Sequence, residues 1–159
     1  MRAFEARLKR MLRSLDTDGI FDPESGLLTR DSFWHDLGIA MAEAADRSMP
    51  LSIARFSFDN SPDARATLDA ARLMSRLIRN IDFAMRDEEG AILVAFTQTD
   101  LRSMHVIARR IAGSLKRMIL APQGEEPPAA NVTLATLKAG DTLDTLMMRV
   151  VGSRMVAAE

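Results

Sequence analysis

The chain has 159 residues, of which 47% are apolar, and this is enough for one folded domain with a hydrophobic core. Its 21 lysines and arginines nearly balance its 22 aspartates and glutamates, so no chain-wide charge attracts nucleic acid or an anionic membrane. The lack of cysteine excludes disulfides, a thiolate nucleophile and cysteine-ligated zinc. Any anion site must therefore be local.

Metal and membrane signals are also missing from the sequence. The two histidines, His35 and His105, stand far apart in helical patterns, and neither has a second ligand residue at metal-binding spacing. No apolar run reaches the length of about 18 residues that a spanning helix needs, and the charged N-terminus does not resemble a signal peptide. We expect a cytoplasmic protein with no metal, no cofactor, no nucleic acid partner and no membrane insertion.

The first residues predict a helix separate from the main domain. Over 1–15, apolar side chains recur at helical spacing between basic ones, which is typical of an amphipathic stalk helix. Aspartate, glycine and proline then interrupt the pattern over 16–23, as in a linker. We divide the chain into a stalk helix and linker over 1–21 and a domain over 22–159.

Helical and extended patterns alternate along the domain. Thr29 is a suitable N-cap for a helix that ends before Pro50. The further elements are expected, in chain order, as a strand over 51–58, a helix over 62–79, a hairpin of strands 81–86 and 91–97 joined by the polar turn 87–90, a helix over 100–119, a loop over 122–130, a strand over 132–137, a turn at 140–142 and a last helix from Leu143.

This order predicts an α+β domain of the ferredoxin-like type. Strand–helix–strand followed by strand–helix–strand is the split βαβ arrangement, in which one central antiparallel sheet carries helices on a face. Many unrelated activities share this fold, so function has to be argued from particular residues.

Several landmarks resemble, in order, those of the GGDEF family of nucleotide cyclases. The segment 22–33 (DPESGLLTRDSF) is similar to the family's D-x-L-T-G-L-x-N-R-x-x-F, and the strand 51–59 is similar to the one that ends in the family's D-x-D. The segment 79–87 is similar to the R-x-x-D-x-x-x-R-x that precedes the GGDEF turn. Residues 132–133 and 140–142 are similar to a later strand and to the turn that follows it. The resemblance covers about 22–151 and implies the nucleotide cyclase (GGDEF) fold.

The sequence departs from the family where cyclases hold metal. The resemblance implies divalent ions held by the first Asp of D-x-D and by an acid of the turn, because joining two GTP molecules requires them. The matching positions are Ser57 and the pair 90–91, and Glu88 and Glu89 replace the two glycines that let the backbone approach the nucleotide. The family's F-K-x-x-N-D stretch and A-D-x-A-L-Y-x-A-K ending are also missing. We expect a degenerate GGDEF domain that is not an enzyme and has no catalytic residues.

The resemblance retains one ligand motif, the R-x-x-D pair Arg79 and Asp82. In the family this pair, five residues before the turn, is the inhibitory site for cyclic di-GMP. A planar guanidinium can hold phosphate or guanine, and a carboxylate can accept hydrogen bonds from the N–H edge of guanine. One charge-assisted contact is far weaker than micromolar binding, so Arg76, Arg72 or an arginine of a second subunit would have to contribute.

Two functions stay open from the sequence. One is a cyclic di-GMP receptor that binds through the four residues above. The other is a protein-interaction module of a larger bacterial signalling protein, which forms a homodimer through the N-terminal helix and binds an unidentified signalling partner without any nucleotide. In the second case Arg79 and Asp82 form only an exposed ion pair worth about 0–1 kcal/mol. The stripe of Arg65, Arg72 and Arg76 then faces water and pairs with Asp69.

Overall fold

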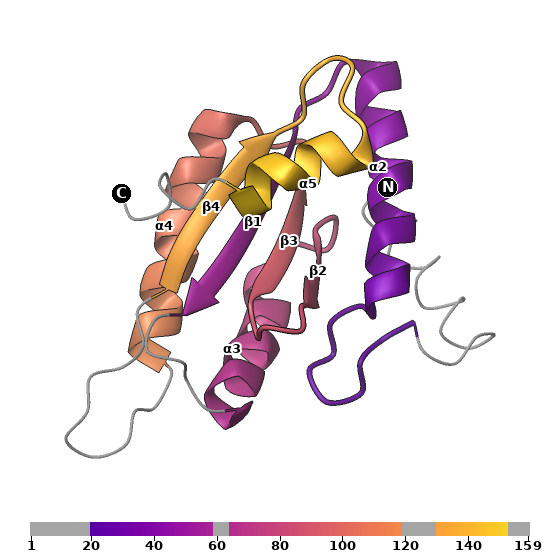
Figure 1. Cartoon of the computed structure of the whole chain (residues 1–159). Coiled ribbons are helices and arrows are strands. Elements are labelled where there is room, and N and C mark those ends of the chain that lie inside the picture. The colour runs from indigo at the N-terminus through magenta and orange to yellow at the C-terminus, as the bar shows by residue number, and fades with distance from the viewer. Residues whose placement is uncertain (1–19, 59–63, 119–129, 153–159) are drawn as a thin grey trace.

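The computed structural model describes residues 20–58, 64–118 and 130–152 (Figure 1). Asp59, the stalk helix expected over 1–15 and most of the loop expected over 122–130 lie outside these ranges. The first described residues, Ile20 and Phe21, already pack in the core, so the folded unit includes two residues of the expected linker.

The described elements follow the predicted order. They are α2 (Arg30–Arg47), β1 (Leu51–Phe58), α3 (Ala64–Leu77), β2 (Phe83–Arg86), β3 (Ile92–Thr97), α4 (Leu101–Met118), β4 (Ala130–Thr136) and α5 (Leu143–Gly152). Thr29 occupies the N-cap position of α2 as predicted, although its side chain does not cap the helix. Strand β4 begins at Ala130, which the sequence had placed in the preceding loop.

The strands form one antiparallel sheet in the order β2-β3-β1-β4. Helix α3 connects β1 to β2 across β3, and α4 connects β3 to β4 across β1. Such crossovers have one hand, which places both helices on the same face of the sheet. This arrangement confirms the predicted α+β fold.

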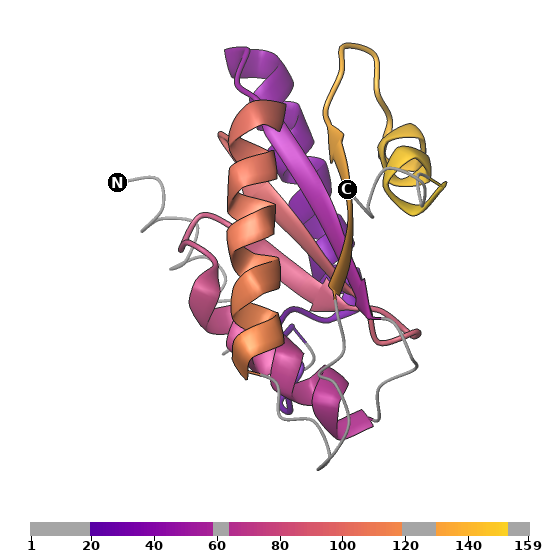
Figure 2. The same cartoon turned by 90° about the vertical axis from the view of Figure 1, so that its left-hand side faces the viewer.

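Helices cover both faces of the sheet, and not one face as the sequence pattern suggested (Figure 2). Successive strand residues point to opposite faces. In β1, Phe56 packs with α3 and α4, while Ile53 packs with α2 and α5. The second layer exists because Phe33 of α2 and Leu146 of α5 are fully buried and cover the apolar side chains on that face.

The opening motif is a folded loop that leads into α2. The Ser25 hydroxyl donates to Asp22 Oδ2 at 2.8 Å, and Gly26 adopts the left-handed backbone conformation with φ of +79° that favours glycine. Asp22 Oδ2 also lies 3.5 Å from Nη2 of Arg86, at the end of β2. The motif therefore fixes the loop against the hairpin.

No helix within the described ranges is both long and apolar enough to cross a membrane.

Candidate functional site

The hairpin turn between β2 and β3 is closed by Asp87. Its Oδ1 accepts the backbone N–H groups of Glu89 and Ala91, each at 2.9 Å. Gly90 has φ of +83°, and a Cβ there would lie 3.0 Å from Cγ2 of Thr67 in α3. The turn thus depends on its own aspartate and on glycine at position 90.

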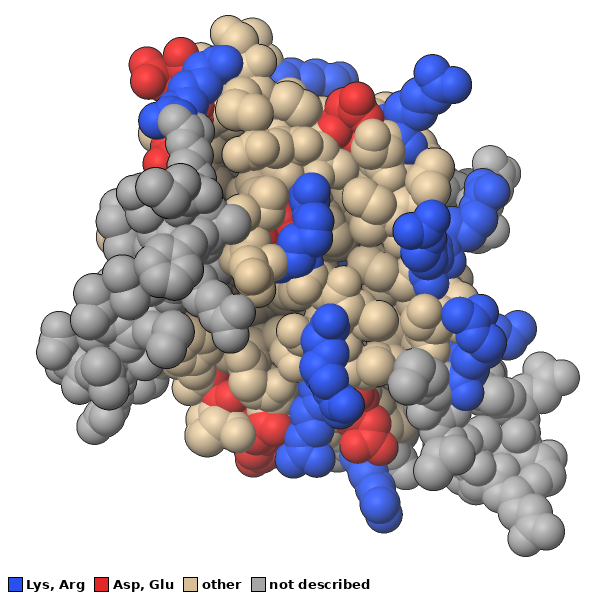
Figure 3. Space-filling model, turned by 180° about the vertical axis from the view of Figure 1, so that it is seen from behind, with Lys and Arg blue, Asp and Glu red and all other residues tan. Residues whose placement is uncertain are grey.

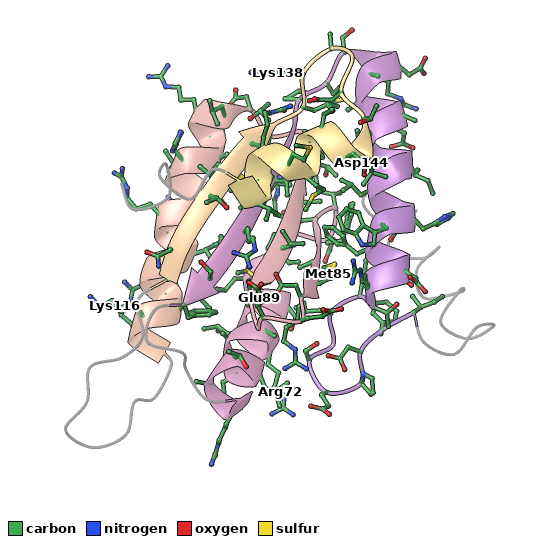
Figure 4. The ribbon with its side chains drawn as sticks, viewed as in Figure 1. Arg72, Met85, Glu89, Lys116, Lys138 and Asp144 are labelled. Carbon is green, nitrogen blue, oxygen red and sulfur yellow. The ribbon has the colours of Figure 1, made fainter. Side chains whose placement is uncertain are left out.

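Arg55 of β1 pairs with two acids of this turn. Its Nη2 lies 2.9 Å from Oε2 of Glu89 and 3.2 Å from Oδ2 of Asp87. Figure 4 shows Glu89 near the start of β3. Only 12% of the Arg55 side chain is exposed, so solvent screens this charge less than it would at the surface. A fixed guanidinium therefore stands where β1 meets the acidic turn.

The positions that match metal ligands in the family carry no carboxylate. Ser57 Oγ lies 3.5 Å from the carbonyl oxygen of Asn131, and Ala91 is buried. Within the described part of the chain, no three His, Asp or Glu side chains are grouped so that they could hold a metal ion. These two positions therefore offer a divalent ion one hydroxyl group and no side-chain carboxylate.

Surface hollows lie on both sides of the turn. One, of about 550 Å³, is lined by the turn, by the first turn of α3 including Arg65, and by Glu24. The other, of about 560 Å³, lies between α2 and α5 and has an apolar lining that includes Trp34, Met85 and Met147. Six of the eleven residues that line this apolar hollow are charged, and three of them are the acids of the turn.

Arg79 and Asp82, the predicted ligand pair, form a closed ion pair just after α3. Arg79 donates through Nε to Oδ2 at 2.9 Å and through Nη2 to Oδ1 at 3.1 Å. The carboxylate also accepts the backbone N–H of Arg79 at 3.1 Å and that of Thr97 at 3.2 Å. The side chain of Asp82 is 1% exposed and that of Arg79 is 48% exposed. Asp82 is thus a buried acceptor that the chain already uses fully.

The guanidinium of Arg79 is also held by the end of β3. Its Nη2 donates to the carbonyl oxygen of Thr97 at 2.9 Å and to the hydroxyl of Thr99 at 2.7 Å. Its Nη1 makes no hydrogen bond with the described residues. The group is therefore fixed in orientation while about half of the Arg79 side chain, 48%, is exposed.

Among the described residues, no hydrogen bond or ion pair joins the other predicted ligand residues, Arg72 and Arg76, to this pair. Arg72, labelled in Figure 4, donates through Nε to the carbonyl oxygen of Glu24 at 2.8 Å. Arg76 is exposed near the end of α3. Neither Arg76 nor Asp69 forms an ion pair with another described residue, so the predicted pairing of Asp69 with the arginines of its stripe is wrong.

Another ion pair, which the sequence did not indicate, fixes the start of α5. Arg149 Nη1 lies 2.6 Å from Asp141 Oδ1, and its Nη2 donates to Asp141 Oδ2 at 2.8 Å and to the carbonyl oxygen of Thr136 at 2.7 Å. The hydrogen bond from Arg149 holds the pKa of Asp141 well below its usual value, although burial acts in the opposite direction. The same pairing raises the pKa of Arg149.

Comparison with known proteins identifies the fold. No protein-family model matches the sequence, and no curated protein is significantly similar to it. Among solved structures, the coiled coil and GGDEF domain of DgcB from Caulobacter crescentus, in complex with cyclic di-GMP, has a TM-score of 0.79 at 18% identity and covers 99% of this chain and 90% of that one. Diguanylate cyclase SiaD from Pseudomonas aeruginosa, in complex with its activator SiaC, has a TM-score of 0.78 at 20% identity and covers 98% of this chain and 65% of that one.

The GGDEF domain of FimX from Pseudomonas aeruginosa has a TM-score of 0.73 at 16% identity, and the match covers 87% of this chain and 93% of that chain. These proteins share the sheet and the helix layers of the present chain. The chain therefore has the fold of GGDEF domains, as the landmarks in its sequence led us to expect.

Proposed function

We propose that this chain is a catalytically inactive GGDEF-like signalling domain that binds cyclic di-GMP at Arg79. The observation that carries the proposal is the guanidinium of Arg79, which the chain holds in one orientation while about half of the side chain is exposed. An arginine fixed in advance loses little conformational freedom when it binds. DgcB and another microbial GGDEF domain have been solved with cyclic di-GMP, which supports the choice of ligand.

In this proposal Arg79 contacts the ligand and Asp82 positions Arg79. Asp82 is buried and accepts four hydrogen bonds within the chain, so it cannot reach guanine unless these bonds break. Arg76 and Arg72 add positive charge on the preceding helix, and Arg72 would have to leave the carbonyl oxygen of Glu24. Several such contacts are required, since one alone falls short of micromolar binding.

The proposed lack of cyclase activity depends on three residues near the turn. Metal-assisted transfer of a nucleotidyl group requires anionic oxygens around the divalent ions. Ser57 offers a hydroxyl and Ala91 offers no polar side chain, while Arg55 places a guanidinium against the acids of the turn. A divalent cation at this place would meet repulsion from that fixed positive charge.

Calorimetry of the chain with cyclic di-GMP tests the binding proposal. We expect saturable heat of binding that Arg79→Ala removes. Arg30→Ala is the matched control, because it also removes one exposed arginine but at a distant position in the sequence, and it should leave the heat unchanged. A chain that gives no heat at high micromolar concentration, or that binds equally well as Arg79→Ala, would contradict the proposal. Incubation with GTP and magnesium or manganese tests inactivity, and the appearance of a cyclic dinucleotide would refute it.

A specific observation also supports the alternative, a protein-interaction module. On α5, Met148 is 71% exposed and Val151 is 48% exposed, next to the apolar hollow that Met147 lines. SiaD has been solved with an activator protein, so one protein of this fold binds a protein partner. We propose dimerisation through residues 1–15 as the form this takes, and sedimentation should show a concentration-dependent dimer that is lost when these residues are deleted. A strict monomer in both cases would exclude that dimer.

A further inference from the structure

Charge is unevenly distributed over the chain although its net charge is −1. Helices α3 and α4 together carry eight basic residues and one acid, Asp69. The rest of the chain therefore has 13 basic and 21 acidic residues. Figure 3 shows the molecule from behind, and basic side chains project along its right-hand side, where α4 lies, without acidic ones between them.

Helix α4 has five basic residues and no acid. They are Arg102, Arg109, Arg110, Lys116 and Arg117. Three of them recur every seven residues, so they share one side of the helix, and the set extends over about 22 Å. All five are exposed, whereas Met104, Ala108, Ile111 and Leu115 point into the core.

The charge on this side of α4 is balanced by other described residues only at its first turn, where Asp100, just before the helix, attracts Arg102. None of the five forms an ion pair with them, and the one recorded side-chain bond, from Arg117 Nη2 to Ser114 Oγ at 3.3 Å, stays within the helix. Two apolar side chains, Leu101 at 46% and Val106 at 56%, are exposed on the same helix. We call the exposed side of α4, defined by its five basic residues, the α4 cationic face.

We propose that the α4 cationic face docks on an anionic lipid bilayer. A layer of anionic headgroups requires only positive charge and side-chain reach, and long arginine side chains supply both. Helix α4 has no Phe, Tyr or Trp and no Asn or Gln, so apart from His105 and its arginines it lacks the side chains that proteins use to stack on bases or to read their edges. Of the three residue types that dominate binding between proteins, tryptophan, tyrosine and arginine, the exposed side has only arginine. Nucleic acid and protein partners therefore fit this surface less well than lipid does.

The remainder of the chain favours one orientation on such a bilayer. The residues outside α3 and α4 are net acidic as a whole, although 1–15 carry five basic residues and one acid, so an anionic surface attracts the α4 cationic face and repels most of the rest. Helices α2 and α5 lie on the other face of the sheet and point away from the lipid. The interaction is peripheral, and it is independent of the proposed binding of cyclic di-GMP at Arg79.

Co-sedimentation of the full chain with vesicles tests the proposal. We expect binding to phosphatidylcholine vesicles that contain phosphatidylserine, no binding to pure phosphatidylcholine, and weaker binding as salt rises. The triple variant Arg102→Gln, Arg109→Gln, Arg110→Gln should weaken binding on the order of 100-fold, at about fivefold for each cation. The matched control Arg30→Gln, Arg47→Gln, Lys138→Gln removes the same charge from other surfaces and should change binding less than about threefold.

The decisive measurement compares vesicle binding by the two triple variants. Circular dichroism checks that both variants remain folded. Equal weakening by the two sets would show that net charge and not the α4 cationic face drives adsorption, and would overturn the proposal. Failure of the unsubstituted chain to bind phosphatidylserine vesicles at low salt would overturn it as well. So would binding to duplex DNA at a salt concentration at which vesicles are not bound.

Discussion

Arg79 donates through Nε to Asp82 Oδ2 at 2.9 Å, and the two partners differ sharply in exposure, since 48% of the Arg79 side chain and 1% of the Asp82 side chain are accessible. The two residues therefore have different tasks. The carboxylate of Asp82 accepts backbone N–H groups, including that of Thr97 at the end of β3, and the guanidinium of Arg79 pairs with this carboxylate. A motif known for ligand binding can thus be required for folding even before any ligand is considered.

Asp82→Ala should lower the free energy of unfolding by roughly 2–4 kcal/mol. The substitution leaves the backbone N–H groups of Arg79 and Thr97 without their acceptor in a buried place, and it removes one partner of an ion pair. Urea unfolding measures the change. Arg76→Ala, which removes an exposed arginine of α3 without described contacts, is the control and should stay within about 0.5 kcal/mol.

A loss below about 1 kcal/mol in Asp82→Ala would show that the carboxylate is dispensable for folding. In that case Asp82 would be free to serve the ligand directly, and its proposed role of positioning Arg79 would be wrong.

Asp141→Asn should destabilise the chain at neutral pH by about 1–3 kcal/mol, and the difference from the unsubstituted chain should shrink in acid. The hydrogen bond from Arg149 lowers the pKa of Asp141 in the folded state. A carboxyl group with a lowered folded pKa contributes stability above its unfolded pKa, near 4, and loses it as pH falls towards the folded value. Thermal melts of both proteins from about pH 7 down to about pH 3 measure the difference.

If the difference in stability between the two proteins stays constant over this pH range, the charge of Asp141 does not contribute to the stability of the fold. Asp144→Asn, on the exposed first turn of α5, removes a charge of the same sign nearby and should have little effect at any pH.

Periodicity was sufficient to predict the elements and the hairpin, and the resemblance to the GGDEF family singled out Arg79 and Asp82. Neither could predict that Asp82 is buried, because the groups that enclose the pair, Thr97 and Thr99, follow 15 or more residues later and meet it only through the pairing of β2 with β3. The covering of both sheet faces was missed for the same reason, since it depends on how α2 and α5 return to the sheet.

The role of Arg55 also depends on tertiary structure, although the sequence holds one signal for it. Arg55 and Ser57 are two residues apart in β1, so they share a face of the strand, and the acidic turn follows in the hairpin that pairs with this strand. A basic residue on that face, next to a run of three acids in the paired hairpin, indicates an ion pair between β1 and the turn.

Arg55→Gln should lower the free energy of unfolding by about 1–3 kcal/mol, because the change leaves Asp87 and Glu89 close together without their cation. The effect should decrease as salt rises, since ions then screen the repulsion between the carboxylates. Denaturant unfolding at low and high salt measures both effects. Arg30→Gln breaks the exposed pair with Glu88 and should cost less than about 1 kcal/mol.

Gly90→Ala should destabilise the hairpin by about 1–3 kcal/mol for two separable reasons. The φ of +83° is unfavourable for any residue with a side chain, and the new Cβ would lie 3.0 Å from Cγ2 of Thr67. Thr67→Ser removes that methyl group, so the double variant should recover the part of the loss that comes from the contact but not the part that comes from the backbone. The stability expected without coupling is the sum of the two single changes. If the double variant is no more stable than this sum, the contact with α3 contributes nothing to the loss of stability in Gly90→Ala, and glycine is required only for the backbone conformation of the turn.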